Sequence, residues 1–452
     1  MNNREVIKKL IVKIEQNYDV NSWVHNGYKI WPVLRIALYM ILVNRLIKHQ
    51  KQYKKTKQNY LKSLLLCFLH TKDILQYRKN TKYLYVGATT YCVNYKGYMY
   101  NRYFDPLMDA NTFSSIYLSK SDSKNGVYKP ERHLLTKSIF KVFSGFNKFF
   151  KSQSKSHNYV DKLCDILKNE NVRVDEIKEK LKKSVIDVDS SYFIYLILFK
   201  RLNPEQIWVL WYYSYEVLGM LIAADKLSIP TIDLQHGGQG ENHLAYNSWT
   251  KVPKEGYEAL PNYFYTWDAS SANHINTWAL KNKKHSAVVF GNPWVEGWKK
   301  NKFVESDYEW PENIILYTLQ PLNDPIEDFL IDTVKKSDDN WNWWFRLHPR
   351  QIDDENLISD RLKRCNLLDR VNIQDATYLH LPEILLHTEV HITQFSGSAG
   401  EAYQFGIPTI LINKIGVDYY KEYIKSNDLM YSSTEKDSNR LYSMLKELIT
   451  KN

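Results

Sequence analysis

The chain has 452 residues, more than one hydrophobic core normally serves, so we expect two domains. Hydrophobic residues make up 44% and charged residues 25%, which is typical of a globular protein. The net charge of +11 indicates an anionic partner, but no zinc-finger, RNA-recognition or helix-turn-helix motif accompanies it, so we do not expect nucleic acid. The four cysteines lack metal or disulfide spacing and the amino terminus lacks a signal peptide's apolar core, which predicts a cytoplasmic protein.

Residues 1–80 are predicted to be helical and contain an apolar stretch from Ile30 to Ile47. A proline and two arginines interrupt this stretch, so it is a poor candidate for spanning a bilayer. Lysines cluster after it between Lys48 and Lys62, and again between Lys120 and Lys155. Two interpretations remain open. The stretch is either an interfacial helix, which would attach the protein peripherally to the anionic inner face of the cytoplasmic membrane, or a buried helix of the first domain.

Residues 81–300 alternate between strand and helix patterns, which favours an α/β domain with a parallel sheet covered on both faces. The predicted strands begin near Lys82, Gln206, Pro230 and Ala287. Two separate helices are expected over Tyr159–Lys183 and Ser190–Leu202, and Ser114–Lys155 is interpreted as an insertion or a mobile loop.

A second α/β unit is predicted over residues 311–430, beginning after Pro311. Its strands are expected at Asn313–Tyr317, at Trp343–Phe345 and on both sides of a turn near Gly397. A C-terminal helix follows within residues 431–452. The predicted fold class is therefore α/β, with two Rossmann-like domains whose parallel sheets face a central cleft.

His391–Asn413 has the layout of a phosphate-binding segment, because a strand, a small-residue turn, a helix start and a second strand follow one another. Ser396, Gly397 and Ser398 supply hydroxyl groups and unhindered N–H groups, and the helix directs its positive end toward them. Glu401, in the first helical turn, is suited to accept hydrogen bonds from ribose hydroxyls. An ordinary capped helix of an α/β domain is the alternative.

Two further motifs of the second unit follow strands. Gln320 comes after the first strand, and Arg346-Leu347-His348-Pro349 comes after a later one. The carboxyl ends of parallel strands line one crevice, so these residues and Ser396–Ser398 are predicted to face the same ligand. Arg346 and His348 would bring positive charge and hydrogen-bond donors, which suits a nucleotide phosphate.

The His-Pro motif followed by DATYLHLPEILLHTEVHITQFSGSAGEAYQFGIPTI resembles the donor domain of GT-B glycosyltransferases of bacterial capsule and lipopolysaccharide assembly. It is most similar to sialyl-, polysialyl- and Kdo-type transferases, which use CMP-activated sugars. The resemblance covers residues 313–413. It implies that His348, Pro349, Ser396 and Ser398 hold the CMP phosphate and assist its departure. This chain has Ser-Gly-Ser where polysialyltransferases have adjacent serines.

The first domain contains Asp233-Leu234-Gln235-His236-Gly237-Gly238-Gln239-Gly240 after a strand. The glycines allow a sharp turn and a close ligand approach, which would place His236 at the mouth of the crevice. The segment also resembles the Trp-His-Gly loop of CDP-glycerol and ribitol-phosphate polymerases, while a histidine that caps a turn is the structural alternative. The transfer also needs a base that takes the proton from the hydroxyl group of the acceptor substrate. For this role we rank His236 first, Asp105 second and Glu216 third.

Asp187-Val188-Asp189 matches the metal-binding Asp-x-Asp pattern of GT-A transferases. We interpret it as a polar junction between two helices, where aspartates serve as caps. No metal or other cofactor is expected, since a helix dipole, an arginine and a histidine offset the charge of a leaving phosphate.

These observations predict a metal-independent glycosyltransferase, with an acceptor domain at 81–300 and a donor domain at 311–430. Its substrates would be a CMP-activated nonulosonic or Kdo-type sugar and a glycan or lipid-linked glycan acceptor. Two alternatives remain: transfer of a polyol phosphate from CDP-glycerol or CDP-ribitol, and a non-catalytic protein that binds glycans or membranes.

Overall fold

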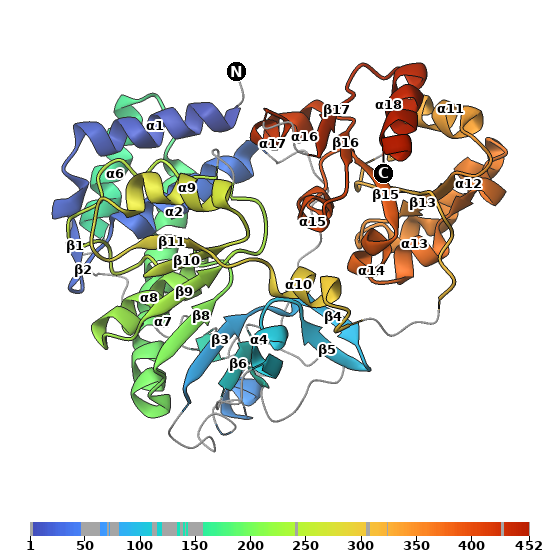
Figure 1. Ribbon diagram of the computed structural model, residues 1–452. Helices are drawn as coiled ribbons and strands as arrows, with labels where there is room; N and C mark the ends of the chain where they lie inside the picture. Colours follow the sequence, from blue (N-terminus) through green and yellow to red (C-terminus); the bar gives the residue numbers. More distant parts are fainter. Residues whose placement is uncertain are drawn as a thin grey trace. The chain divides into compact units, whose positions relative to one another are not determined.

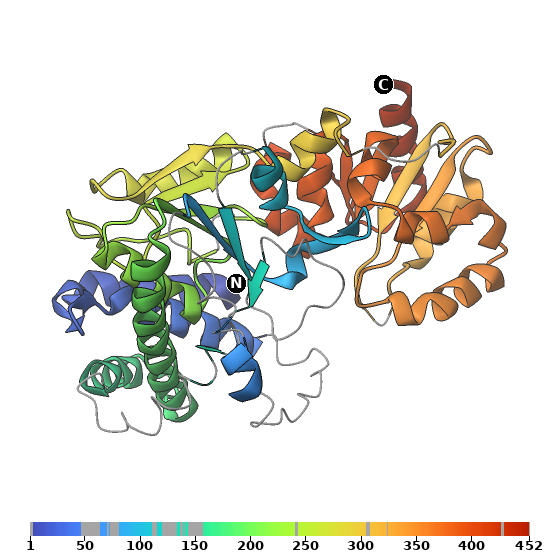
Figure 2. The same ribbon diagram turned by 90° about the horizontal axis from the view of Figure 1, so that it is seen from below.

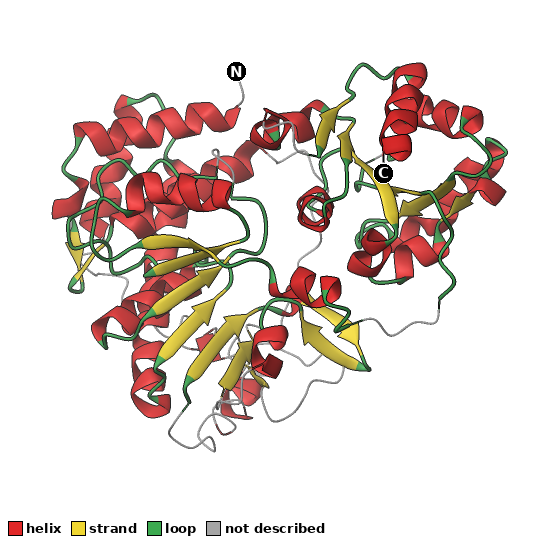
Figure 3. Ribbon diagram, viewed as in Figure 1, coloured by secondary structure: helices red, strands yellow, loops and turns green. Residues whose placement is uncertain are grey.

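The computed structural model describes residues 3–46, 81–110, 157–239, 243–303, 308–322, 324–425 and 429–451, together with residues 64–69, 72, 115–119, 133–135, 139–140 and 142. The chain forms two compact units, Met1–Pro293 and Trp294–Asn452 (Figure 1). The division therefore precedes Pro311, where the sequence suggested it. Each unit contains one parallel sheet with helices around it, which confirms the predicted α/β class with two Rossmann-like units (Figure 3).

The first unit has a seven-stranded parallel sheet. Its strands, in spatial order, are β11 (Ser286–Val289), β10 (Tyr263–Thr266), β9 (Thr231–Leu234), β8 (Gln206–Val209), β3 (Tyr83–Gly87), β6 (Ser115–Ser119) and β7 (His133–Leu135). Chain order reverses between β3 and β8, so the topological switch point lies there. Strands β6 and β7 belong to the segment interpreted as an insertion, and that interpretation is wrong for them.

Helices and short hairpins complete the first unit. The helices are α1 (Asn3–Asn17), α2 (Trp31–Leu46), α4 (Asp105–Ala110), α6 (His157–Asn169), α7 (Asp175–Leu202), α8 (Tyr215–Lys226) and α9 (Ala269–Ala279). The 3-10 turns are η1 (Val20–Ser22) and η2 (Thr89–Tyr91), and the antiparallel hairpins are β1 (Val24–His25) with β2 (Tyr28–Lys29) and β4 (Cys92–Tyr95) with β5 (Tyr98–Asn101).

Helix α7, the long green helix of Figure 2, is continuous where the sequence suggested two helices. Asp187 and Asp189 therefore lie within it and not in a junction. The Asp189 carboxylate is buried and accepts hydrogen bonds from Asn26 and Tyr28, at 3.0 and 3.1 Å, while His25 Nε2 lies 2.9 Å away. Asp189 thus attaches the β1–β2 hairpin to α7.

The second unit has a six-stranded parallel sheet. Its strands, in spatial order, are β14 (Val371–Asn372), β13 (Asn342–Arg346), β12 (Ile314–Thr318), β15 (Thr388–Thr393), β16 (Thr409–Leu411) and β17 (Met430–Ser432). Every residue of β12 is buried, as expected for a central strand covered on both faces. The switch point lies between β12 and β15, because the chain builds the sheet outward from β12 in one direction and from β15 in the other.

The helices of the second unit are α11 (Asp328–Lys336), α12 (Glu355–Arg364), α13 (Gln374–Tyr378), α14 (Leu381–Leu386), α15 (Ser398–Phe405), α16 (Lys414–Tyr419), α17 (Lys421–Lys425) and α18 (Ser438–Lys451), with α10 (Pro293–Lys299) at the boundary and 3-10 turns η3 (Ile352–Asp354) and η4 (Leu368–Arg370). The predicted C-terminal helix, α18, buries Leu441, Leu445 and Leu448 in the core beneath this sheet. One face of the sheet thus has its own terminal helix as a cover.

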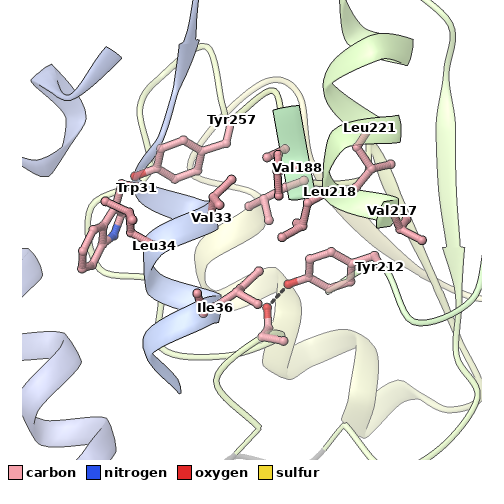
Figure 4. Packing of buried hydrophobic residues seen from close by; sticks show 14 of the residues in the cluster. Trp31, Val33, Leu34, Ile36, Val188, Tyr212, Val217, Leu218, Leu221 and Tyr257 are labelled. Atoms are coloured by element: carbon pink, nitrogen blue, oxygen red, sulfur yellow. Dashed lines mark hydrogen bonds between the residues drawn. The ribbon is translucent and has the colours of Figure 1, made fainter. Parts of the chain in front are cut away.

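Helix α2 belongs to the main core of the first unit, as the buried alternative required. Trp31, Val33, Leu34 and Ile36 are fully buried in a cluster that includes residues of α7 and α8 (Figure 4). The interfacial alternative for Ile30–Ile47 is therefore wrong. The lysines between Lys48 and Lys62 lie outside the described residues, as do all of those between Lys120 and Lys155. Within the part of the chain that the structure describes, none of the helices has the length and hydropathy needed to cross a bilayer.

An ion pair between Glu15 of α1 and Arg35 of α2 is buried in this core, with the two side chains 1% and 0% exposed. Arg35 Nε lies 2.8 Å from Glu15 Oε1, and its Nη2 donates to the Asn247 and Ser248 carbonyls at 3.0 and 2.9 Å. Arg35 Nη1 donates to the Leu244 carbonyl. The arginine that seemed to interrupt an apolar helix thus binds two helices to the segment 244–250.

Substitution of Arg35 by Met should lower the free energy of unfolding by about 3–5 kcal/mol, because it leaves the Glu15 carboxylate buried without its cation. Urea denaturation of the full chain measures this change. The control is Lys9→Met, which breaks an exposed pair with Glu5 at 3.4 Å and should cost less than about 1 kcal/mol. Equal effects of the two substitutions would contradict the structural role assigned to Arg35.

Candidate functional site

The carboxyl ends of β12 and β15 bring several predicted residues of the second unit to one sheet edge. Gln320 follows β12, and Ser396–Gly397–Ser398 follows β15 and begins α15. Gln320 is buried and donates through Nε2 to the Leu319 carbonyl at 3.0 Å. The switch point of the sheet therefore lies beside the predicted phosphate-binding turn, where an open α/β sheet leaves a crevice.

The turn before α15 is accessible at Gly397 and closed at Ser398. Gly397 is exposed, and a Cβ built on it meets no atom within 4 Å. The Ser398 side chain is buried, with its Oγ 2.8 Å from Thr318 Oγ1. Ser396 is half-buried, and its Oγ accepts from the Ser398 N–H at 3.3 Å. A ligand oxygen therefore has room at Gly397 and Ser396, near the positive end of the helix.

Arg346 and His348 make contacts within the second unit, and their binding of a nucleotide phosphate stays a prediction. Arg346 Nη1 donates to the Ala376 and Leu379 carbonyls, at 2.6 and 2.8 Å, and so holds α13 beside β13. His348 Nδ1 accepts from the Arg350 N–H at 3.1 Å. Burial, and then the charge of Arg350, keep the pKa of His348 below its usual range, so the ring is mainly neutral near pH 7. Pro349 follows it in an exposed turn.

Glu401 lies in the first turn of α15, as predicted, near the buried phenol of Tyr420. Its contact with ribose hydroxyls stays a prediction. His391, which the sequence analysis did not single out as a site residue, is fully buried next to this turn. Burial lowers the pKa of His391 to about 3, so its ring is neutral at physiological pH.

The first unit places His236 in a loop directly after β9, at the carboxyl edge of its sheet. The His236 ring packs against Tyr91 and Tyr213, with ring centroids 5.4 and 6.2 Å apart. The Tyr103 hydroxyl donates to the His236 carbonyl at 3.2 Å. The histidine thus lies among aromatic rings from separate segments of the chain, an environment in which a sugar ring can stack.

Two buried polar residues shape the His236 loop and were missed by the sequence analysis. Asp233 accepts from the Tyr246 hydroxyl at 3.0 Å and from the Tyr212 N–H at 3.2 Å. Gln235 donates to the Gly237 carbonyl at 3.0 Å and accepts from the Trp267 N–H at 2.7 Å. A signal was present, since an aspartate and a glutamine within an apolar strand need buried partners.

His243 lies near His236. The centroid of the His243 ring is 5.0 Å from the ring centroids of both Tyr213 and Tyr246. Burial, followed by the nearby His236, lowers the pKa of His243 to about 3. A neutral His243 adds no positive charge to the site near pH 7.

The two carboxylates ranked after His236 each have a partner within the fold. Asp105, at the start of α4, accepts from the Asn101 N–H at 2.6 Å. Glu216, in the first turn of α8, accepts from the Tyr195 hydroxyl of α7 at 2.7 Å. These contacts match the capping and packing roles of such residues, and their catalytic roles stay predictions. Among the residues that the structure describes, no group of three or more His, Cys, Asp or Glu side chains is arranged to hold a metal ion.

Comparison with known proteins identifies the fold class. No protein-family model matches the chain, and neither does any curated protein. A solved UDP-N-acetylglucosamine 2-epimerase is similar over 83% of this chain and 88% of its own, with a TM-score of 0.51 and 13% identity. A putative UDP-N-acetylglucosamine 2-epimerase from Listeria monocytogenes is similar over 82% and 88%, with a TM-score of 0.50 and 12% identity. The chain therefore has the GT-B-like fold of these two structures.

These neighbours correct the function predicted from the sequence. The similar structures are UDP-N-acetylglucosamine 2-epimerases and not sialyl-, polysialyl- or Kdo-type transferases. The prediction of a CMP-sugar transferase acting on a capsule or lipopolysaccharide glycan is therefore wrong, and the CDP-polyol alternative is not retained. The error arose because a turn that binds a phosphate carries no information about the base or the sugar attached to it.

Gly397→Ala should leave the melting temperature unchanged and weaken pyrophosphate binding at least about tenfold, because the methyl group occupies the accessible side of the turn. The backbone at Gly397 has φ −62°, which alanine adopts without strain. Isothermal titration calorimetry and thermal unfolding measure the two effects.

The matched control is Gly416→Ala, whose Cβ would lie 2.1 Å from the Gln394 carbonyl oxygen. It should lower the free energy of unfolding by about 1–3 kcal/mol through overpacking. Undiminished pyrophosphate affinity of the Gly397 variant would exclude this turn as the phosphate site.

Proposed function

We propose that the protein is an enzyme that epimerises a UDP-linked 2-acetamido sugar. The observation that carries the proposal is the accessible Ser396–Gly397 turn at the switch point of the second unit. The likeness of the fold to UDP-N-acetylglucosamine 2-epimerases over more than four fifths of the chain supports the choice of UDP.

The chemistry requires a site for pyrophosphate and a group that transfers a proton. The hydrogen on carbon 2 of a 2-acetamido sugar is too weakly acidic to be removed alone, so its removal is coupled to departure of UDP. The C2–H bond and the bond from carbon 1 to UDP break, and a double bond forms between carbons 1 and 2. Return of UDP to carbon 1 and of the proton to the opposite face of carbon 2 completes the epimerisation. The Ser396 hydroxyl and the start of α15 stabilise the negative charge of departing UDP in this proposal.

His236 is our candidate for the proton transfer. Its ring is half-buried among Tyr91 and Tyr213, so water around it is reduced, and its loop is held by Gln235. Imidazole exchanges protons near neutral pH, which suits a group that must both take and return a proton. Asp105 and Glu216 are weaker candidates, because the Asn101 N–H and the Tyr195 hydroxyl bind their carboxylates.

The nucleotide preference is tested by thermal unfolding with UDP, UDP-N-acetylglucosamine, CMP, CDP and GDP, each at the same concentration. We expect the two uridine compounds to raise the melting temperature most, because ligands that bind only the folded state stabilise it. The reaction is then tested in D₂O, where NMR should detect deuterium at carbon 2 of the recovered UDP-sugar. Stabilisation by cytidine compounds alone, or no deuterium incorporation from UDP-linked 2-acetamido sugars, would refute the proposal.

His236→Asn should lower kcat by about 10²–10⁴-fold, because asparagine keeps much of the shape but cannot transfer the proton. The dissociation constant of UDP should remain within about threefold of the wild-type value. Tyr103→Phe is the control, since it removes the hydroxyl that donates to the His236 carbonyl and leaves the imidazole in place. If turnover survives His236→Asn, another residue moves the proton.

A further inference from the structure

A hydrogen-bond network centred on His391 joins three elements beneath the turn of the second unit. Its Nε2 lies 2.9 Å from Thr318 Oγ1 of β12 and 3.3 Å from Ser398 Oγ of α15. Its Nδ1 lies 3.2 Å from Thr409 Oγ1 of β16. All four side chains are buried, so water does not compete for these contacts. The network therefore spans both sides of the switch point between β12 and β15.

The hydrogen bonds of this network determine which ring nitrogen of His391 carries a proton. His391 is neutral and carries one N–H group. The Thr409 hydroxyl donates to the Ile407 carbonyl at 3.4 Å, so Thr409 Oγ1 is left to accept from Nδ1–H of His391. Nε2 is then an acceptor and receives a proton from one of the two hydroxyls near it.

The two hydroxyl oxygens, Thr318 Oγ1 and Ser398 Oγ, are 2.8 Å apart, a separation that requires a proton between them. The shorter contact to Nε2 is that of Thr318, so Thr318 donates to His391 and Ser398 donates to Thr318. In the opposite arrangement, Ser398 donates to Nε2 and Thr318 donates to Ser398. The Ser398 proton points into the protein in both arrangements.

We propose that His391 is a positioning residue that holds the Ser398 hydroxyl through Thr318 and fixes the start of α15 against β12 and β16. Ser398 then has no proton to donate to a ligand. The N–H groups of Ser396, Ser398, Ala399 and Gly400 donate within the protein. A ligand oxygen at this turn is therefore bound by the Ser396 hydroxyl and by the Gly397 main-chain N–H. The proposal rests on the proposed function only for the identity of the ligand, a nucleoside diphosphate.

Imidazole suits this position because it has two hydrogen-bonding atoms on opposite sides of one rigid ring. Asparagine places its amide near the position of Nδ1 and can keep the contact to Thr409 alone. Glutamine reaches the position of Nε2 and can keep the contacts to Thr318 and Ser398. The two substitutions therefore separate the halves of the network.

The first test is the tautomer of His391 in the ligand-free protein, measured by ¹⁵N NMR and assigned by the signal that disappears in His391→Gln. We expect the Nδ1–H tautomer at pH 7. The Nε2–H tautomer or a doubly protonated ring would overturn the proton arrangement. This result does not depend on whether the protein binds UDP.

The second test compares UDP dissociation constants of His391→Asn, His391→Gln, Ser398→Ala and the double variant His391→Asn/Ser398→Ala. We expect His391→Asn and Ser398→Ala each to weaken UDP binding about tenfold. The double variant should lose no more affinity than the single variant that shows the larger loss. His391→Gln should restore binding to within about threefold of the wild type. A general loss of stability would not produce this difference between Asn and Gln.

Additive losses in the double variant would mean that Ser398 contacts the ligand independently of His391, which overturns the proposal. If His391→Asn fails to fold, the remaining variants still test the proposal. It is overturned if Ser398→Ala binds UDP as tightly as the wild type while His391→Gln binds it more weakly. If UDP does not bind at all, the proposed function fails. Two measurements then still test the role of His391. They are its tautomer and the non-additivity of the unfolding free energies of His391→Asn and Ser398→Ala in urea denaturation.

Discussion

The buried pair of Glu15 and Arg35 determines how the first unit is assembled. Two charges removed from water must be fully paired, and Arg35 meets this demand with Glu15 and with carbonyl groups of the segment 244–250. Its guanidinium also lies 3.9 Å from the Trp249 ring centroid. Tyr246, within this segment, donates to Asp233 at the end of β9. The first two helices are thereby connected to the strand that carries the His236 loop.

The two units use the same geometric solution in different chemical forms. In each sheet the chain order reverses beside a central strand, and the connections leave that edge in opposite directions. The first unit fills this edge with aromatic rings around a histidine. The second unit has small polar residues and a helix start. An aromatic edge suits a sugar ring, and a polar edge suits a phosphate.

Much of the second unit was predictable because its signals are local. The strand before Ser396, the turn at Gly397 and the helix with Glu401 all appear where short-range patterns placed them. The partners of Arg346 and Ser398 were not predictable in this way, since they are carbonyl and hydroxyl groups of other elements. The resemblance to CMP-sugar transferases relied on phosphate-binding motifs. Such motifs recur in enzymes that bind different bases and sugars, so they did not support the prediction of a CMP-linked sugar.

The sequence by itself determined the α/β class, the positions of most strands and the turn before α15, because hydrophobic periodicity and small-residue turns act over a few residues. Only the tertiary structure decided which polar groups are paired. Arg35 looked like a defect in an apolar helix until its acceptor at Asn247, 212 residues away along the chain, was known. His391 looked like one residue of a strand until three hydroxyl groups surrounded it. A buried polar side chain is defined by its partners, and distance along the chain does not reveal them.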